Sequence, residues 1–181
     1  MQVAIAIFTT LGGLSAIWFF RDKIDAWLRK KFTPTSVIPP SSLRATDVVL
    51  FERILRLLPY EPVGRFLQHQ NFAGHFDTRE WAGIHAYLSF ADSPECRFLD
   101  SQLETIRCRM TKNLIQFLDG AHGNIWPGNA EHRIGVPNEW LNEEHPRYGE
   151  YWPAVSKLNA LARSAHEPYA LLVKKGRSKL P

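Results

Sequence analysis

The sequence predicts an all-α protein that consists of one N-terminal transmembrane helix and a cytosolic α-helical bundle. Residues 3–20 carry no charged side chain, and most segments after residue 43 repeat apolar residues at helical spacing. No convincing run of alternating strand residues occurs. We therefore expect a transmembrane helix with an amphipathic stem in 1–32, a linker rich in proline and serine in 33–42, and a helical bundle in 43–181.

The uncharged run Val3–Phe20 is long enough to cross a membrane. A helix of this length rises about 27 Å, close to the thickness of a hydrocarbon core. Only Met1 and Gln2 precede the run, so the positive n-region of a signal peptide is missing. The run also has no strongly polar face, which disfavours a core helix of a soluble domain. A single retained span is therefore preferred over a leader peptide or a core helix.

The residues that follow the apolar run predict its orientation. The cations of this flank all lie on the C-terminal side, and positive residues stay in the cytoplasm. The N-terminus is therefore expected outside and the bundle inside, with an amphipathic stem or an ordinary stop-transfer flank after Phe20. The residues expected at the membrane interface are Trp18, Arg21, Lys23, Trp27, Arg29, Lys30 and Lys31.

Small residues form one narrow face of the predicted span. Ala6, Thr9, Gly13 and Ala16 recur at steps of three and four, and membrane helices associate through such faces because their backbones approach closely. The face predicts self-association into a homo-oligomer, and it is also a candidate pore lining; a chance occurrence of small residues is the alternative. No charge lies inside the run, so no charged selectivity ring is expected.

The first segments of the bundle carry helix signals. One helix is expected after an N-cap at Thr46 or Asp47, with Pro59 as its stop and its apolar face formed by Val49, Leu50, Ile54 and Leu57. A short helix should start at Pro62. A third helix, capped by Asp77 or Thr78, should direct Trp81, Ile84 and Leu88 inward.

The strongest helical pattern begins with Ser93 as the N-cap and Pro94 at the first helical position. It predicts a helix of about 28 residues that ends near Gly120 or Gly123. A long ordered loop follows, with one short helix near Trp140, and then a final pair of helices, the second of which has Pro168 in its first turn. The expected core positions of the long helix are Leu99, Leu103, Ile106, Met110, Leu114 and Phe117.

Composition limits the classes of function. With 45% hydrophobic residues the chain has material for a core, and its net charge of +4 is well short of the density typical of a nucleic-acid binder. Two cysteines, Cys96 and Cys108, fit a reducing compartment. The seven histidines show no zinc-ligand spacing, and neither a G-x-S-x-G motif nor a P-loop occurs. We therefore predict no metal, no cofactor and no enzyme activity as the main expectation.

One catalytic alternative comes from the stretch "REWAGIH". Arg79 and His85 match the spacing of an arginine, four to six residues and a histidine that HEPN-class ribonucleases carry, where arginine holds phosphate and histidine moves a proton. In a chain with this content of arginine and histidine, chance alone is expected to produce about one match to this spacing. Six residues turn a helix by about 600°, so the two side chains share a face poorly.

The stretches "LLPYEPVGRFLQHQNFAGHF" and "FLDSQLETIRCRMTKNLIQFLDGAHGNIWP" follow the predicted span. In this layout the chain resembles small single-pass membrane effectors of bacterial anti-phage defence. Examples are the Hailong-type channel effectors and the HEPN-like membrane protein that accompanies RNA-targeting CRISPR effectors. The resemblance implies no catalytic residue for this chain.

The resemblance implies a homo-oligomer in the bacterial inner membrane that forms a channel or pore and depolarises the bilayer in abortive infection. Control would come through the cytosolic helical domain, from a signal-producing or nucleic-acid-processing partner or from an oligonucleotide ligand. Two alternatives remain open at this point: a membrane-tethered HEPN-like ribonuclease, and a passive anchor or scaffold that recruits a partner protein to the lipid bilayer.

Overall fold

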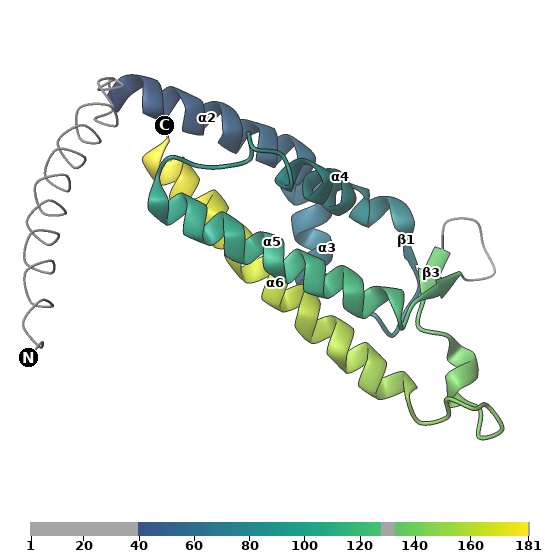
Figure 1. The fold of residues 1–181 in the computed structure, drawn as a ribbon. Coiled ribbons are helices and arrows are strands. Elements are labelled where there is room, and N and C mark those ends of the chain that lie inside the picture. The colour runs from purple at the N-terminus through teal and green to yellow at the C-terminus, as the bar shows by residue number, and fades with distance from the viewer. Residues whose placement is uncertain (1–39, 128–132, 181) are drawn as a thin grey trace, which may run out of the picture. The chain divides into compact units, whose positions relative to one another are not determined.

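A computed structural model describes residues 40–127 and 133–180 (Figure 1). The predicted span, its small face and its interface residues lie outside the described residues, so the structure does not test them. None of the helices within the described ranges has both the length and the apolar character that crossing a bilayer requires. Helices make up most of the described chain, in agreement with the predicted all-α class.

The helices and strands alternate with short connections. Their order is α2 (Pro40–Leu57), η1 (Tyr60–Gly64), α3 (Arg65–His69), β1 (Phe76–Asp77), η2 (Thr78–Trp81), α4 (Ala82–Ala91), α5 (Ser101–His122), β2 (Trp126–Pro127), β3 (Arg133–Gly135), η3 (Asn138–Leu141) and α6 (Tyr151–Lys179).

The antiparallel pair of α5 and α6 is the scaffold of the bundle (Figure 1). Side chains at heptad-like spacing on α5 are fully buried, as the sequence predicts, and they pack against an equally buried row on α6. The α2 helix lies along the second half of α6, where the ring of Phe51 sits directly over Gly176. The buried positions of the scaffold include Leu103, Met110, Leu114, Phe117, Leu158, Ala165 and Leu172.

Aromatic rings close the core at the opposite half of the scaffold. Phe66 of α3 contacts Phe72, Phe76 and Phe117, with ring centroids 5.7, 5.2 and 6.2 Å apart. The rings meet at steep angles, the arrangement that aromatic pairs prefer. Trp81 extends the cluster by an edge contact with Phe76 at 5.4 Å. The cluster joins α3, β1, η2 and α5 into one core.

A small antiparallel sheet of order β1-β3-β2 lies at the same end, where the sequence predicts only a loop and a helix cap. Phe76 pairs with Ile134, and Trp126 pairs with Gly135. The sequence analysis did not anticipate these short strands, although helices make up most of the described chain. Strands of two or three residues are too short to display an alternating pattern, so the sequence carries no signal for them.

The first described helix starts earlier than predicted. It begins at Pro40, so the predicted linker 33–42 overlaps its first turn, where proline is well tolerated because its missing N–H has no helical partner. Asp47 is therefore inside the helix and not its N-cap. The apolar face was also partly misassigned: Val49 is exposed, whereas Phe51 and Leu58 are buried beside Leu50 and Ile54.

The long helix starts later than predicted. Asp100, not Ser93, is its N-cap and accepts hydrogen bonds from the N–H groups of Gln102 and Leu103, both at 2.9 Å. The helix spans 22 residues, Leu99 is exposed before it, and Cys96 lies in the preceding loop. The Ser93-Pro94 pair is a local helix-start pattern, but a long-range contact determines the start of α5. Asp47 of α2 accepts hydrogen bonds from the backbone N–H groups of Leu99 and Asp100.

The predicted final pair of helices is one continuous helix, α6. Pro168 stands inside it and is buried, and the apolar face continues across it from Ala165 to Tyr169 and Leu172. Proline removes one backbone hydrogen bond, but packing on α5 holds both halves in line. The Tyr169 hydroxyl also donates to the carbonyl of Leu58 at 2.9 Å.

Other local predictions are confirmed. A helical run occupies 60–69, and Asp77 caps η2 by accepting from the Arg79 N–H at 2.8 Å. The short helix near Trp140 is η3, and Ile84 is fully buried on α4. Short-range cap chemistry was therefore predictable wherever tertiary contacts did not compete.

Gly83 provides a test of how α4 approaches α2. A Cβ built there would lie 2.5 Å from the Leu57 carbonyl oxygen and 2.9 Å from Val63 Cγ2. We expect Gly83→Ala to destabilise the bundle by about 1–3 kcal/mol, because the backbone carbonyl cannot move aside as a side chain can. The measurement is the free energy of unfolding in urea. Ser89→Ala on the exposed face of α4 is the matched control, and equal stability of both variants would contradict the close approach.

Candidate functional site

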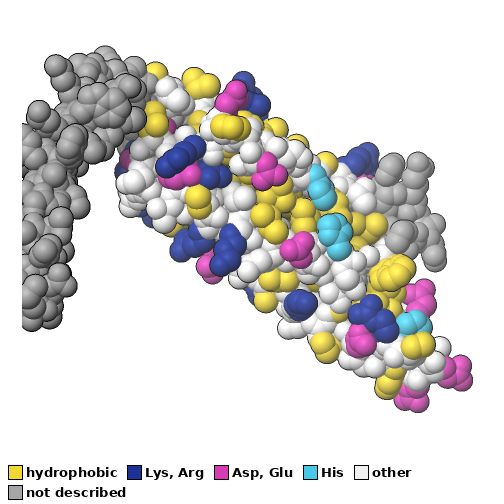
Figure 2. Space-filling view, viewed as in Figure 1, with side chains coloured by type: hydrophobic (Ala, Val, Ile, Leu, Met, Phe, Trp, Pro, Cys, Tyr) yellow, Lys and Arg dark blue, Asp and Glu magenta, His cyan; other side chains and the backbone are white. Residues whose placement is uncertain are grey.

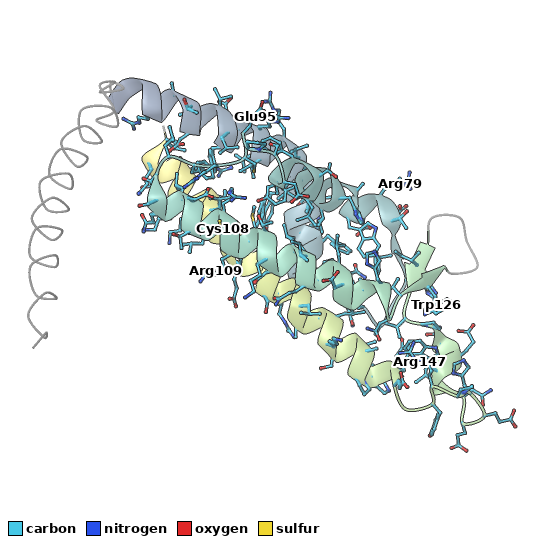
Figure 3. All side chains as sticks on the ribbon, viewed as in Figure 1. Arg79, Glu95, Cys108, Arg109, Trp126 and Arg147 are labelled. Atoms are coloured by element: carbon cyan, nitrogen blue, oxygen red, sulfur yellow. The ribbon has the colours of Figure 1, made fainter. Side chains whose placement is uncertain are left out.

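The structure does not join the predicted pair Arg79 and His85. The Arg79 guanidinium is held by Asp77, with Nε 2.9 Å from Oδ1, and its side chain is 79% exposed (Figure 3). The hydrogen bond and the charge of Asp77 raise the pKa of Arg79. His85 is exposed on α4 and its ring contacts Trp81, at 5.9 Å between centroids. Among the described residues, no hydrogen bond or ion pair joins Arg79 to His85.

A buried polar network lies instead around Arg107, which is 8% exposed. Its Nε and Nη2 donate to the Glu104 carboxylate at 2.9 and 2.7 Å, and this hydrogen bonding raises the pKa of Arg107. Burial raises the pKa of Glu104, but hydrogen bonds from Arg107 and the Phe98 N–H outweigh it and lower the pKa overall. Burial also raises the pKa of Tyr87 to about 12, while its hydroxyl lies 2.7 Å from Thr111 Oγ1.

Both cysteines border this network. Arg107 Nη2 lies 3.2 Å from Cys108 Sγ, and Arg107 Nη1 lies 3.9 Å from Cys96 Sγ. Burial raises the pKa of each thiol, more than the arginine lowers it. A raised pKa favours the protonated thiol, which is a weaker nucleophile and metal ligand than the thiolate. Through these contacts the network ties the loop before α5 to α4 and α5.

No cluster of three or more histidine, cysteine, aspartate or glutamate side chains lies within metal-binding distance in 40–127 and 133–180.

Large apolar side chains are exposed together at one end of the bundle, which we call the aromatic end. It is formed by β2 and by the chain from η3 to the start of α6 (Figure 3). Exposed tryptophans are unusual, and tryptophan and tyrosine are enriched at protein interfaces. The exposed fractions are 56% for Trp126, 47% for Leu141, 53% for Tyr148 and 63% for Trp152.

The aromatic end is also acidic. Exposed carboxylates accompany the apolar side chains, and magenta side chains gather at this end in Figure 2. Such a mixture of aromatic and acidic groups suits a cationic protein surface and repels phosphate. The acidic residues are Glu139, Glu143, Glu144 and Glu150.

Arg147 holds this end in a fixed conformation. Its guanidinium stacks on the buried Trp140 ring at 3.5 Å and donates to Glu150 Oε2 at 2.6 Å and to the Gly123 carbonyl at 3.3 Å. The next turn is anchored by the Tyr151 hydroxyl, which donates to the Ala73 carbonyl at 2.6 Å. The exposed rings therefore belong to a segment that several side-chain contacts hold in place, which lowers the entropic cost of ordering this segment when a partner binds.

The other end of α6 forms a basic end, defined by Arg44, Lys174, Lys175, Arg177 and Lys179. Arg44 Nη2 donates to the Lys179 carbonyl at 3.1 Å, and Lys179 Nζ donates to Asp100 Oδ2 at 2.6 Å. The hydrogen bond from Lys179 lowers the pKa of Asp100. The start of α2, the start of α5 and the end of α6 therefore meet at one place.

The two ends are far apart. The 29 residues of α6 rise about 43 Å from the glutamates at its start to the cations at its end. Sequence spacing alone gave no reason to expect these cations beside the start of α2.

No protein family, curated protein or solved structure matches this chain, so its function has to be inferred from its own residues.

Arg147 offers a test of the aromatic end. We expect Arg147→Ala to lower local stability by about 1–2 kcal/mol, because the stacking on Trp140 and the hydrogen bond to Gly123 are lost together. Arg147→Lys keeps the charge but not the planar stack, and it should restore only part of the effect. Hydrogen exchange of residues 138–150 is the measurement. Unchanged exchange in Arg147→Ala would show that this side chain does not fix the end.

Proposed function

We propose that the chain is an oligomeric membrane effector of bacterial anti-phage defence. Residues 3–20 cross the inner membrane with the N-terminus outside, associate through Ala6, Thr9, Gly13 and Ala16, and form a channel or pore that depolarises the membrane. The cytosolic bundle controls this assembly through a partner. The proposal for the span is supported by its length, its uncharged composition and its positive flank.

One structural observation supports a regulatory bundle more than a catalytic one: the aromatic end is a built interaction surface. Trp126 and Trp152 are exposed there, and Arg147 stacks on the buried Trp140 beside them and is paired with Glu150. Arg79 and Arg107 are likewise each held by a carboxylate, so none of these three arginines is aimed at a substrate. An interaction module needs such a rigid, partly apolar surface, and an enzyme needs groups aimed at a reacting atom.

The charge of the aromatic end favours one kind of partner. Glu150 is paired with Arg147, but Glu139, Glu143 and Glu144 are exposed and in no ion pair among the described residues. They suit a cationic protein and disfavour an oligonucleotide at this place because phosphate would be repelled. A signal-producing or nucleic-acid-processing protein with a basic docking surface is therefore the partner that this end fits best.

The small face of the span gives the first test of the proposed function. We expect Gly13→Leu to lower the oligomeric state and to abolish depolarisation in cells, because a bulky side chain keeps the helices apart. Leu14→Ile, at the next position and outside the small face, is the matched control and should have little effect. Particle size by light scattering and electron microscopy, together with a potential-sensitive dye, gives both readouts.

Two results would contradict the channel. A detergent-purified chain that is strictly monomeric would exclude an oligomeric pore. If an unrelated apolar helix in place of residues 3–20 preserved the cellular effect, the span would be a passive anchor and the bundle a scaffold.

The ribonuclease alternative has its own test. We expect Arg79→Ala combined with His85→Ala to retain depolarisation and cell death, because both side chains are exposed and Arg79 is engaged by Asp77. The N-cap of η2 should persist in this double variant, because the Asp77 side chain accepts a hydrogen bond from the backbone N–H of residue 79, which alanine retains. Loss of the cellular effect together with loss of RNA cleavage would establish the nuclease instead. RNA integrity and membrane potential are measured in the same cells.

A further inference from the structure

We infer that the basic end of the bundle docks on anionic lipid headgroups, so that the bundle stands on the membrane with its aromatic end toward the cytoplasm. This inference rests on the proposed function, because it takes residues 3–20 to be a membrane span. It concerns a surface to which the sequence analysis gave no role.

The covalent chain brings the basic end close to the predicted bilayer. The α2 helix begins at Pro40, and residues 33–39 connect it to the predicted stem. Seven extended residues reach at most about 25 Å. Arg44 lies one turn into α2, and its bond to the Lys179 carbonyl attaches the end of α6 to the same place. With the predicted amphipathic stem along the bilayer surface, a connection of this length keeps the cations of α6 within reach of the headgroups.

The cations of this end are available to headgroups. Within the described residues, no ion pair engages Lys174, Lys175 or Arg177, and Lys174 and Arg177 are exposed. The carboxylates nearby are already bound: Asp47 accepts two backbone N–H groups, and Asp100 accepts from Lys179 and from the start of α5. Clusters of lysine and arginine beside a membrane helix are attracted by the anionic lipids of the cytoplasmic leaflet.

A hollow of about 530 Å³ opens among these residues. Its wall carries two cations, Arg44 and Lys179, and two carboxylates, Asp47 and Asp100, which are already engaged by backbone N–H groups and by Lys179. Leu99, which is 53% exposed, and Leu180 place apolar atoms there. Apolar side chains beside cations suit the boundary between headgroups and acyl chains. An oligonucleotide would use the same cations but gains nothing from the leucines, so the mixed lining favours lipid.

The opposite end agrees with this orientation. The glutamates of the aromatic end are about 43 Å away along α6, and an anionic leaflet repels them. The cations of the basic end and the glutamates of the aromatic end therefore favour the same orientation, in which the aromatic end points away from the membrane.

Site-specific labelling of the full chain in vesicles tests the inference. A fluorophore is attached at Ser178→Cys for the basic end or at Asn142→Cys for the aromatic end, in a Cys108→Ser background; Cys96 is buried. Vesicles carry nitroxide-labelled lipid in phosphatidylglycerol mixed with phosphatidylcholine, or in phosphatidylcholine alone. We expect quenching of the label at 178 in the anionic vesicles, weaker quenching in the neutral ones and at high salt, and none at 142.

A charge-matched pair of variants separates local from net charge. Replacing Lys174, Lys175 and Arg177 by glutamine should lower the quenching at 178 by about threefold or more. Replacing Arg109, Lys112 and Lys157 by glutamine removes the same charge elsewhere on α5 and α6 and should leave the quenching unchanged.

The outcomes that overturn the inference are distinguishable from failure of the proposed function. If the chain resists extraction from the vesicles but the label at 178 is unquenched in both lipids, docking is wrong and the span stands. If a single-stranded oligonucleotide protects this end and vesicles do not, it is a nucleic-acid surface. A chain that does not insert at all overturns both proposals.

Discussion

The carboxylate of Asp47 is the contact on which the arrangement of the helices depends. It is only 4% exposed, and it accepts the backbone N–H groups of Leu99 and Asp100 at 2.7 and 2.9 Å. Those N–H groups precede α5, where they have no helical partner, and Asp47 satisfies both of them. One side chain of α2 therefore sets where α5 begins, and it frees the side chain of Asp100 to cap that helix and to bind Lys179.

This contact also explains why charge is divided between the ends of the bundle. Asp100 and Arg44 together hold the last turn of α6, so the cations of that turn gather where α2 begins. The antiparallel scaffold then carries the start of α6, with its glutamates and exposed tryptophans, to the opposite end. The bundle therefore has a basic end that suits an anionic surface and an aromatic end, rich in glutamate, that suits a cationic partner.

The sequence predicted those parts of the fold that local patterns determine. The heptad-like row through Leu103, Met110 and Leu114 was read correctly because it is long and regular. The start of α5 was misread because the Ser93 signal is local and the contact from Asp47 is not. The ordered loop with a short helix near Trp140 was expected, but not which tryptophans it buries: Trp140 is buried under Arg147, whereas Trp152 at the start of α6 is exposed. Sequence spacing cannot separate these two tryptophans, because burial depends on which chain folds back over each ring.

The continuity of α6 limits how a signal can pass between the two ends. A partner bound at the aromatic end acts about 43 Å from the residues that continue toward the predicted span. Pro168 interrupts the backbone hydrogen bonds near the middle of the helix, yet Ala165 and Leu172 on either side of it are fully buried against the core. A close-packed core resists local deformation, so force at one end moves the pair of α5 and α6 as a unit. The proposed control by this bundle would therefore work through the tilt or association of whole bundles, because local unfolding would expose the core that joins its two ends.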